Sequence, residues 1–462
     1  MKKIFIFLSF ILLSFITYTQ EFISSAYHKN FEVKEYDAQP QNWEVIQDNR
    51  GIMYFANTEC VLEYDGTNWR KIKTNFAVRS VVLDSKNRIY VCGTGDFGYL
   101  TPDKIGEMKY ISISSRIDTS KLKTPPDVWS IKIKNNEIYF QTPKKIFKFS
   151  PYSNKDSIFD DSKENLDKIK VFKTKKEFIN IFYKKNKIIV LEDDGYLSYL
   201  ENDKLIETPY NKFFTKKEKI KDLNKFDNNK LLFAFSEKLM IYDEIKDTLL
   251  NFKTDADDFL KKNLIYSCKR ISNNKFSIGT RNGGVIIINK NGKVLDIFNK
   301  ENILKDNTCF NQMHKDGISW FTLNIGISKI ETGSAFRFLG EKNNVGSPIL
   351  SIIKHKKILY ISSFAGISYL EMDKIKDKTK EIKFIEIPNT IQPVWDFQKF
   401  YTKKDTILFA AKTDGLFIVK KDKLEKISSD SYITIKQSLL DTNKLFTGSR
   451  KRIECFSIKK EK

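Results

Sequence analysis

Cysteine, histidine and glycine are scarce in this chain, and each scarcity excludes a class of structure or function. The 462 residues include 5 Cys, 3 His and 19 Gly. The cysteines are odd in number, widely scattered and without a Cys-x-x-Cys pair, so we expect neither a disulfide framework nor a structural zinc site. We interpret them as small core residues. Glycine at about 4% of residues, against roughly 7% on average, excludes collagen-like and glycine-linker architectures.

Long apolar runs are also rare, and the one that stands out lies at the N-terminus. Lys2 and Lys3 precede an apolar run from Ile4 to Ile16, and a small-x-small cleavage signal follows before Gln20. This order predicts a secretory signal peptide over residues 1–19. No later run reaches the ~18 apolar residues of a membrane span. We therefore expect no transmembrane helix beyond the signal peptide, and a periplasmic or secreted location.

Basic residues outnumber acidic residues by 80 to 58, which gives a formal net charge of +22. Such a charge can favour nucleic acid, anionic lipid or acidic polysaccharide. The basic residues are spread evenly, however, and no arginine-rich stripe of the kind that binds nucleic acid is present. We expect no nucleic-acid partner, and the export signal argues against a transcription factor or an ATP-driven enzyme.

One sequence unit recurs along the chain every ~43 residues, a spacing that indicates a repeat architecture. Each unit contains three short alternating strands rich in Ile, Val, Tyr and Phe, separated by polar turns and followed by a looser fourth segment. Three or four antiparallel strands per unit are typical of a β-propeller blade. The ten units begin at Trp43, Arg79, Val128, Phe178, Ile220, Ile265, Phe310, Ile349, Val394 and Ile433.

The predicted fold class is therefore all-β, a β-propeller array of about ten three- to four-stranded blades. Because propellers typically have 4–8 blades, we expect units one to seven (residues 20–335) to close a first propeller. Units eight to ten (residues 336–462) would then form part of a second, truncated propeller with exposed strand edges. A single ten-bladed ring is the alternative. Short helical insertions are expected over residues 162–169 and 255–262.

The first two units carry a more specific signature than the others. Their motifs are NW, YFAN and LEYDG at residues 42–43, 54–57 and 62–66, and VRSV, RIYV and FGY at residues 78–81, 88–91 and 97–99. They resemble the periplasmic sensor region of Bacteroidetes two-component-regulator propeller proteins, also called triple-tyrosine regulators. Units three to ten match only the general blade pattern. Cys60 stands where the family usually has a turn glycine.

This resemblance implies a periplasmic propeller array that senses a ligand. Full members of the family continue into a Tyr-rich immunoglobulin-like domain, a membrane helix and a cytoplasmic output domain, and this chain contains none of these. The expectation is either a sensor fragment that works with a downstream signalling polypeptide or a free-standing binder.

One aligned position varies in chemistry while its neighbours stay regular. It is the second residue of the first strand of each unit, which in a propeller borders the axial funnel. Trp and Tyr can stack on sugar rings, and Arg, Lys and Asn can supply hydrogen bonds. The candidate ligand-binding residues here are Trp43, Arg79, Trp129, Lys221, Tyr266, Asn311 and Trp395. The alternative is that the Trp side chains only pack between blades.

Other motifs carry no recognisable chemistry. Residues 93–98, GTGDFG, match GxGxxG, but a strand and a proline follow instead of a helix, so no nucleotide site is expected. His28, His314 and His355 fit no metal or catalytic spacing, and GxSxG is absent. We predict a non-catalytic propeller without metal or cofactor that binds a small molecule or an oligosaccharide. Alternatives are a secreted polysaccharide lyase or glycosidase, and a protein-binding scaffold.

Overall fold

The computed structural model describes residues 25–118, 120–122, 124–152, 158–214, 219–334, 336–374, 382–402 and 405–457. The expected signal peptide over residues 1–19 lies outside these described residues. The chain divides into two compact units, one spanning Tyr27–Ser334 and the other including residues 25–26 and 336–457. Among the described residues, no helix has the length and apolar character needed to cross a membrane.

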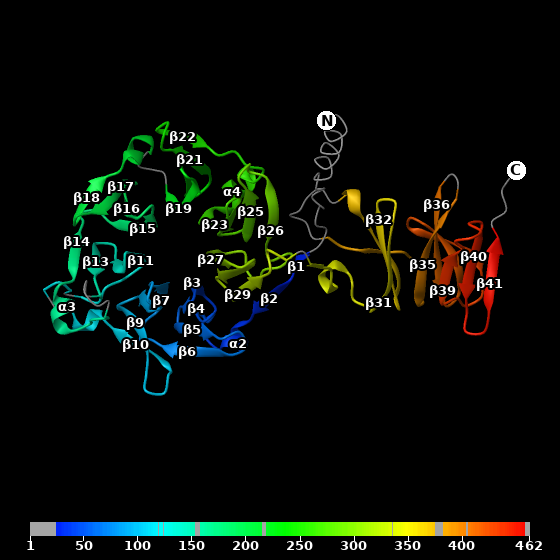
Figure 1. Cartoon of the computed structure of the whole chain (residues 1–462), viewed down its shortest axis with the longest axis horizontal. Helices are drawn as coiled ribbons and strands as arrows, with labels where there is room; N and C mark the ends of the chain where they lie inside the picture. Colours follow the sequence, from blue (N-terminus) through cyan, green and yellow to red (C-terminus); the bar gives the residue numbers. More distant parts are fainter. Residues whose placement is uncertain are drawn as a thin grey trace, which may run out of the picture. The chain divides into compact units, whose positions relative to one another are not determined.

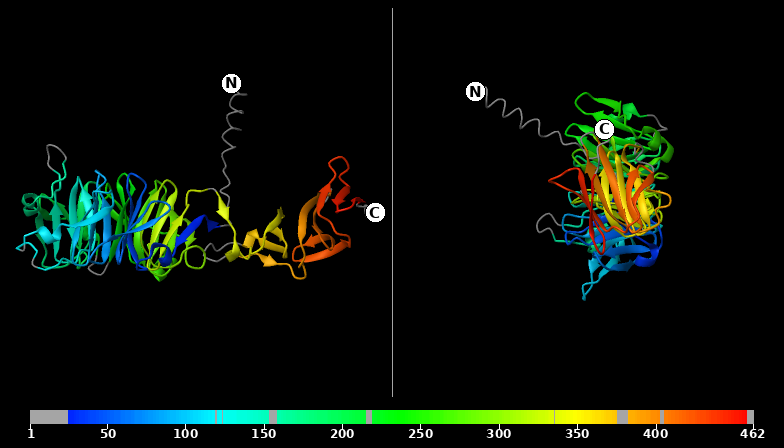
Figure 2. Two further views of the ribbon diagram at one scale, coloured as in Figure 1. Left: turned by 90° about the horizontal axis from the view of Figure 1, so that it is seen from below. Right: turned by 90° about the vertical axis from the view of Figure 1, so that its right-hand side faces the viewer.

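Seven four-stranded antiparallel sheets form a closed ring in the unit Tyr27–Ser334 (Figure 1). Seen from the side, their strands run between the two faces of the ring (Figure 2). The first sheet contains β3 (Asn42–Gln47), β4 (Met53–Asn57), β5 (Cys60–Tyr64) and β6 (Trp69–Lys73), and the second contains β7 (Val78–Leu83), β8 (Ile89–Gly93), β9 (Phe97–Pro102) and β10 (Met108–Ser112). The third contains β11 (Ser130–Lys134), β12 (Glu137–Gln141), β13 (Lys145–Phe149) and β14 (Lys170–Lys173), and the fourth contains β15 (Phe178–Lys184), β16 (Lys187–Glu192), β17 (Leu197–Glu201) and β18 (Lys204–Glu207). The fifth contains β19 (Ile220–Asp227), β20 (Lys230–Phe235), β21 (Leu239–Asp243) and β22 (Thr248–Asn251), and the sixth contains β23 (Ile265–Ser272), β24 (Lys275–Thr280), β25 (Val285–Asn289) and β26 (Val294–Phe298).

The seventh sheet closes the ring with a strand from the other end of the sequence. β27 (Cys309–Lys315), β28 (Ile318–Leu323) and β29 (Ile327–Ile330) are joined by β2 (His28–Phe31), which pairs antiparallel with β29. The ring therefore closes after seven blades, and the single ten-bladed ring is wrong. The predicted three to four strands per blade are confirmed, and the looser fourth segment of each unit forms a full fourth strand in these seven sheets.

Polar turns set the register of the strands. β11 and β12 are joined through Asn135 and Asn136, with φ values of 50° and 62°. Two successive residues with positive φ form the turn that matches the twist of a hairpin, and Asn adopts this conformation readily. The GTGDFG segment is also a hairpin connection, between β8 and β9. A Cβ at Gly93 would lie 1.9 Å from the Ala77 carbonyl oxygen, so this glycine serves close backbone packing.

The core lies between neighbouring blades, where the faces of adjacent sheets meet. Phe97 of β9, for example, packs at 4.3 Å from Phe140 of β12, in the next blade. Four of the cysteines are buried there, as expected, but Cys455 is exposed. It lies on β41 (Ile453–Ser457), whose side chains alternate between exposed and half-buried.

Over its described residues, the other unit contains two four-stranded sheets, one three-stranded sheet and a two-stranded pairing. Its strands are β31 (Ile349–His355), β32 (Ile358–Ser363), β33 (Gly366–Glu371) and β34 (Ile385–Glu386); β35 (Val394–Tyr401), β36 (Thr406–Lys412), β37 (Gly415–Lys420) and β38 (Lys423–Ser428); β39 (Thr434–Gln437), β40 (Lys444–Gly448) and β41; and β1 (Ser25–Ala26) with β30 (Arg337–Phe338). These sheets correspond to units eight to ten of the sequence.

The helices in the described part of the chain are short and lie between strands. They are α2 (Val33–Tyr36), α3 (Lys163–Asp167) and α4 (Asp257–Asn263), with 3₁₀ turns at Ser114–Arg116, Pro209–Phe213, Glu341–Asn343 and Met372–Lys374. The expected insertions over residues 162–169 and 255–262 are confirmed as α3 and α4. Ser162 caps α3, because its side chain accepts a hydrogen bond from the Asn165 amide.

Candidate functional site

A β-bulge near the start of the first strand recurs around the ring. In five blades the register of the inner strand against its neighbour skips one residue near the start of the strand, and that residue is left unpaired. These residues are Trp43 in β3, Arg79 in β7, Ile179 in β15, Lys221 in β19 and Tyr266 in β23. β11 pairs with β12 without a bulge. A bulge re-aims the side chain of the extra residue. The variable position found in the sequence is therefore the bulge position, and its side chains line a cavity on the ring axis.

In the seventh blade the bulge falls one residue earlier than the sequence alignment predicts. β27 begins at Cys309, and the skipped residue is Phe310, not Asn311. Asn311 pairs with Thr322 of β28 and takes the position that Glu44 has in the first blade. The assignment of Asn311 to the variable position is wrong, although its side chain still lines the cavity.

The axial cavity has a volume of about 290 Å³. Seven residues that we call the rim come one from each blade, at the bulge or directly before β11. The seven residues that follow them in sequence, one per blade, we call the wall. Trp129 and Ile179 of the rim are 45% and 52% exposed, whereas Ser80 and Ser267 of the wall are 2% and 6% exposed, so the rim lies nearer to solvent. The rim is Trp43, Arg79, Trp129, Ile179, Lys221, Tyr266 and Phe310, and the wall is Glu44, Ser80, Ser130, Asn180, Asp222, Ser267 and Asn311.

Three aromatic rings from adjacent blades form one side of the rim. Trp43 stacks on Phe310 with ring centroids 4.5 Å apart and planes inclined by 25°. The rings of Tyr266 and Phe310 also meet edge-on, with centroids 5.1 Å apart. Burial raises the pKa of Tyr266, so its hydroxyl stays protonated. This continuous aromatic strip presents the kind of surface on which a sugar ring can stack.

The Arg79 and Trp129 side of the rim is held by contacts within the protein. The Arg79 guanidinium carbon lies 3.7 Å from the centroid of the Trp129 ring. Asp127 pairs with Arg79 and also accepts a hydrogen bond of 3.0 Å from Trp129 Nε1. One face of Trp129 is thus covered, and only the remainder of the ring is accessible to a ligand.

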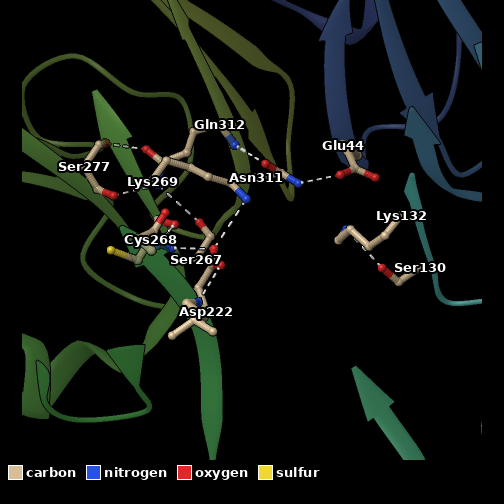
Figure 3. A network of polar contacts seen from close by, with 12 residues as sticks. Glu44, Ser130, Lys132, Asp222, Ser267, Cys268, Lys269, Ser277, Asn311 and Gln312 are labelled. Atoms are coloured by element: carbon tan, nitrogen blue, oxygen red, sulfur yellow. Dashed lines mark hydrogen bonds and ion pairs between the residues drawn. The ribbon is translucent and has the colours of Figure 1, made fainter. Parts of the chain in front are cut away.

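The wall is a polar network that crosses between blades (Figure 3). Glu44 accepts hydrogen bonds from the Ser80 hydroxyl and, at 3.2 Å each, from the Val81 amide and Asn311 Nδ2. Asp222 Oδ2 accepts from the Cys268 amide at 3.2 Å and lies 3.4 Å from Lys269 Nζ. The carboxylate of Asp222 raises the pKa of Lys269, which stays charged. The Lys269 side chain remains 38% exposed, because it faces the cavity.

Positive charge dominates the cavity lining. Five cationic and two acidic side chains face it, an excess of three positive charges. The cations are Arg79, Lys132, Lys221, Lys269 and Arg281, and the acids are Glu44 and Asp222. Lys132 is held by a 3.2 Å hydrogen bond to the Ser130 hydroxyl rather than by an acid.

Trp395 is not among the residues that line the axial cavity. It occupies the equivalent bulge in β35 of the other unit, where its Nε1 donates a 3.0 Å hydrogen bond to Thr413 and its ring meets Phe364 edge-on at 5.8 Å. Of the seven candidate residues, the structure thus brings together Trp43, Arg79, Trp129, Lys221 and Tyr266 in the lining of the axial cavity. Asn311 lines the same cavity one residue after the bulge of its strand.

Several cavity residues were missed by the sequence reasoning. Among them are the wall residues other than Asn311, together with Lys132, Lys269, Arg281 and Phe310. A signal for the wall was present, since the residue after the variable position is polar in all seven units.

The histidines and metal ligands give no competing site. His28, His314 and His355 lie in strands β2, β27 and β31. Burial, together with the charge of Lys269, lowers the pKa of His314 to about 4, so its ring is neutral. Within the described ranges, no three His, Cys, Asp or Glu side chains are grouped as a metal site requires.

No family sequence profile and no curated protein matches this chain. Solved structures do match its fold. The extracellular domain assigned to the hybrid two-component system BT3049 of B. thetaiotaomicron has a TM-score of 0.63 and 14% identity, over 94% of this chain and 60% of that chain. The extracellular domain assigned to the one-component system BT4673 of the same organism has a TM-score of 0.49 and 14% identity, over 93% and 58%. A streptogramin B lyase has a TM-score of 0.49 and 13% identity, over 67% and 99%.

The sheets of the ring show the β-propeller fold, and the likeness to the BT3049 domain is one of fold alone. This chain spans about three-fifths of the length of that domain.

Proposed function

We propose that this chain is a non-catalytic, exported sensory propeller that binds its ligand in the axial cavity of the ring Tyr27–Ser334. The observation that carries this proposal is the aromatic strip of Trp43, Phe310 and Tyr266 beside a polar wall with one residue from every blade. Apolar faces with a few convergent polar groups are the usual composition of a small-molecule site. A glycan fragment suits this combination of stacking surface and hydrogen-bonding groups.

The state of the two cavity acids supports binding rather than catalysis. Glycoside hydrolysis needs one carboxyl as a proton donor and another as nucleophile or base. Glu44 accepts three hydrogen bonds from the protein, and Asp222 is ion-paired to Lys269 while accepting from backbone amides. The oxygen atoms of both carboxylates are thus occupied by fixed partners within the protein, which favours a structural role.

The sensing part of the proposal rests on the regulator resemblance of the first two units and on the shared fold. A free-standing binder would hand its ligand on or sequester it, whereas a sensor must transmit binding to a signalling polypeptide. We propose such a downstream polypeptide as the partner of this chain.

A glycan-array screen followed by isothermal titration of the hits tests the proposal. We expect Trp43→Ala, Tyr266→Ala, Arg79→Ala and Trp129→Ala to weaken binding. The strip variants should lose roughly tenfold or more, by analogy with the stacking of a nucleic-acid base on an aromatic ring, which is worth about 1–3 kcal/mol. Tyr183→Ala is the matched control, because Tyr183 is 38% exposed and lies outside the cavity lining. Unchanged affinity in all four variants would refute the site.

Incubation of the chain with polysaccharides separates the enzyme alternative. Release of unsaturated or reducing-end fragments that is lost in Glu44→Gln or Asp222→Asn would establish a lyase or glycosidase and overturn the non-catalytic assignment.

A further inference from the structure

A second cavity of about 540 Å³ adjoins the axial cavity. The two cavities share two lining residues, Lys221 and Arg281. Lys219 and Glu237 also line the second cavity. A ligand that extends from the aromatic strip into the second cavity must therefore pass two cationic side chains.

The backbone holds both cations in place. Lys221 is the unpaired bulge residue of β19. Arg281 follows β24, and its amide donates to the carbonyl oxygens of Asn263 and Leu264 at 3.1 and 2.9 Å. Its guanidinium carbon lies 5.7 Å from the ring centroid of Tyr266. The cations are thus placed beside the aromatic strip by fixed elements of neighbouring blades.

Neither cation has an acidic partner among the described residues. Of the other three cations that line the axial cavity, Arg79 and Lys269 are paired with Asp127 and Asp222, and Lys132 donates to the Ser130 hydroxyl. Glu237 makes no ion pair with Lys221 or Arg281, although it lines the same cavity. Burial lowers the pKa of Lys221, and the charges of Arg281 and Lys219 lower it further. In the ligand-free protein, like charges are therefore held together without compensation, which an anion would relieve.

We propose that Lys221 and Arg281 form an oxyanion subsite, so that the ligand of the axial cavity is a carbohydrate carrying a carboxylate or a sulfate group. The guanidinium fork can hold such a group with two parallel hydrogen bonds, and the lysine adds a point charge. The sugar ring that bears the anion stacks on Tyr266 and Phe310. This inference rests on the proposed function of the axial cavity and names the chemical class of its ligand.

Calorimetric titration with three probes tests the inference: an oligogalacturonide trimer, a heparin-derived tetrasaccharide and neutral cellotriose. We expect at least one acidic probe to bind and cellotriose not to bind. Lys221→Met and Arg281→Gln should each weaken that binding roughly 10- to 100-fold, the usual range for a lost charge-assisted hydrogen bond. Lys225→Met is the matched control, because Lys225 lies on the same strand but is exposed and outside both cavities.

The two acidic probes distinguish the sources of the anion. Binding of the galacturonide assigns a carboxylate, and binding of the heparin fragment alone assigns a sulfate. Absence of binding by both acidic probes at millimolar concentration overturns the inference. If cellotriose binds, and Trp43→Ala weakens its binding while Lys221→Met does not, the proposed function stands and the inference fails.

A second measurement uses inorganic sulfate and needs no carbohydrate. Sulfate should raise the melting temperature of the wild type more than chloride at equal ionic strength, and this difference should vanish in the Lys221→Met, Arg281→Gln double variant. Lys221→Met should also raise the melting temperature of the ligand-free protein, because one of the repelling charges is gone. An equal sulfate effect in the wild type and the double variant would contradict the subsite.

Discussion

Replacing Phe31 by alanine should weaken the packing of strand β2, which completes the seventh blade, against the first blade. Phe31 is 1% exposed and ends β2. Its ring lies 5.1 Å from Tyr64 and 5.2 Å from Trp69 of the first blade, and stacks at 5.6 Å on Trp320 of the seventh. This one side chain thus contacts both of the blades between which the ring closes, in addition to the direct contacts of Trp320 with Phe55 and Tyr64.

The size of the effect follows from this burial. Truncation of a buried phenylalanine to alanine costs about 3–5 kcal/mol. A unit of about 300 residues unfolds with an entropy of about 0.6 kcal/mol/K near its melting temperature. We therefore expect Phe31→Ala to lower the melting temperature by roughly 5–8 °C.

Calorimetry gives the melting temperature, and hydrogen exchange shows where the protein loosens. Amide protection should fall in β29, which pairs with β2, more than in β20 on another blade. Ile245→Ala is the control, since Ile245 is 77% exposed and its loss should change stability by less than about 0.5 kcal/mol. A melting shift below about 1 °C for Phe31→Ala, or a uniform loss of protection, would refute this view of how the ring closes.

Three further outcomes are expected. In the native protein, the exposed thiol of Cys455 should react quickly with a disulfide reagent. The other four thiols should react slowly, because they are buried and burial raises the pKa of a thiol, to about 12 for Cys60. More than one fast thiol per chain would contradict the assignment of these four cysteines to the core. Folding lowers the pKa of His314 from 6.5 to about 4, so that the unfolded state binds a proton at a higher pH than the folded state does. The free energy of unfolding should therefore fall by about 2 kcal/mol from pH 7 to pH 5. This loss should be absent in His314→Gln, and an equal loss in both proteins would refute the prediction. Gly93→Ala should cost more than about 3 kcal/mol by urea unfolding, because the new Cβ would meet the Ala77 carbonyl at 1.9 Å; a neutral effect would show that the backbone there relaxes.

The repeat pattern predicted much of this architecture because each blade is built from local hairpins. Strand alternation and the Asn-containing turns fix β11 to β12 within a few residues of sequence. Ring closure was not predictable in the same way, since β2 pairs with β29 about 300 residues away and its short sequence, HKNF, carries no strong strand signal.

Several residues that line the axial cavity could be located from one aligned position in the repeat units. The alignment was off by one residue in the seventh blade, where the position depends on backbone geometry. The variable position of the sequence does place Tyr266 in the cavity lining, because the bulge there follows the common register. In the seventh blade the strand starts one residue earlier, at Cys309, so Phe310 reaches the rim instead of Asn311. The unpaired charges of Lys221 and Arg281 depend on the contacts between two blades, which periodicity does not encode.

The most direct test of the central claim is a crystal structure of the chain with the tightest ligand from the glycan screen. The account predicts the sugar on the strip formed by Trp43, Phe310 and Tyr266, with its anionic group within hydrogen-bond distance of Lys221 and Arg281. A ligand bound anywhere outside the axial cavity would contradict the account.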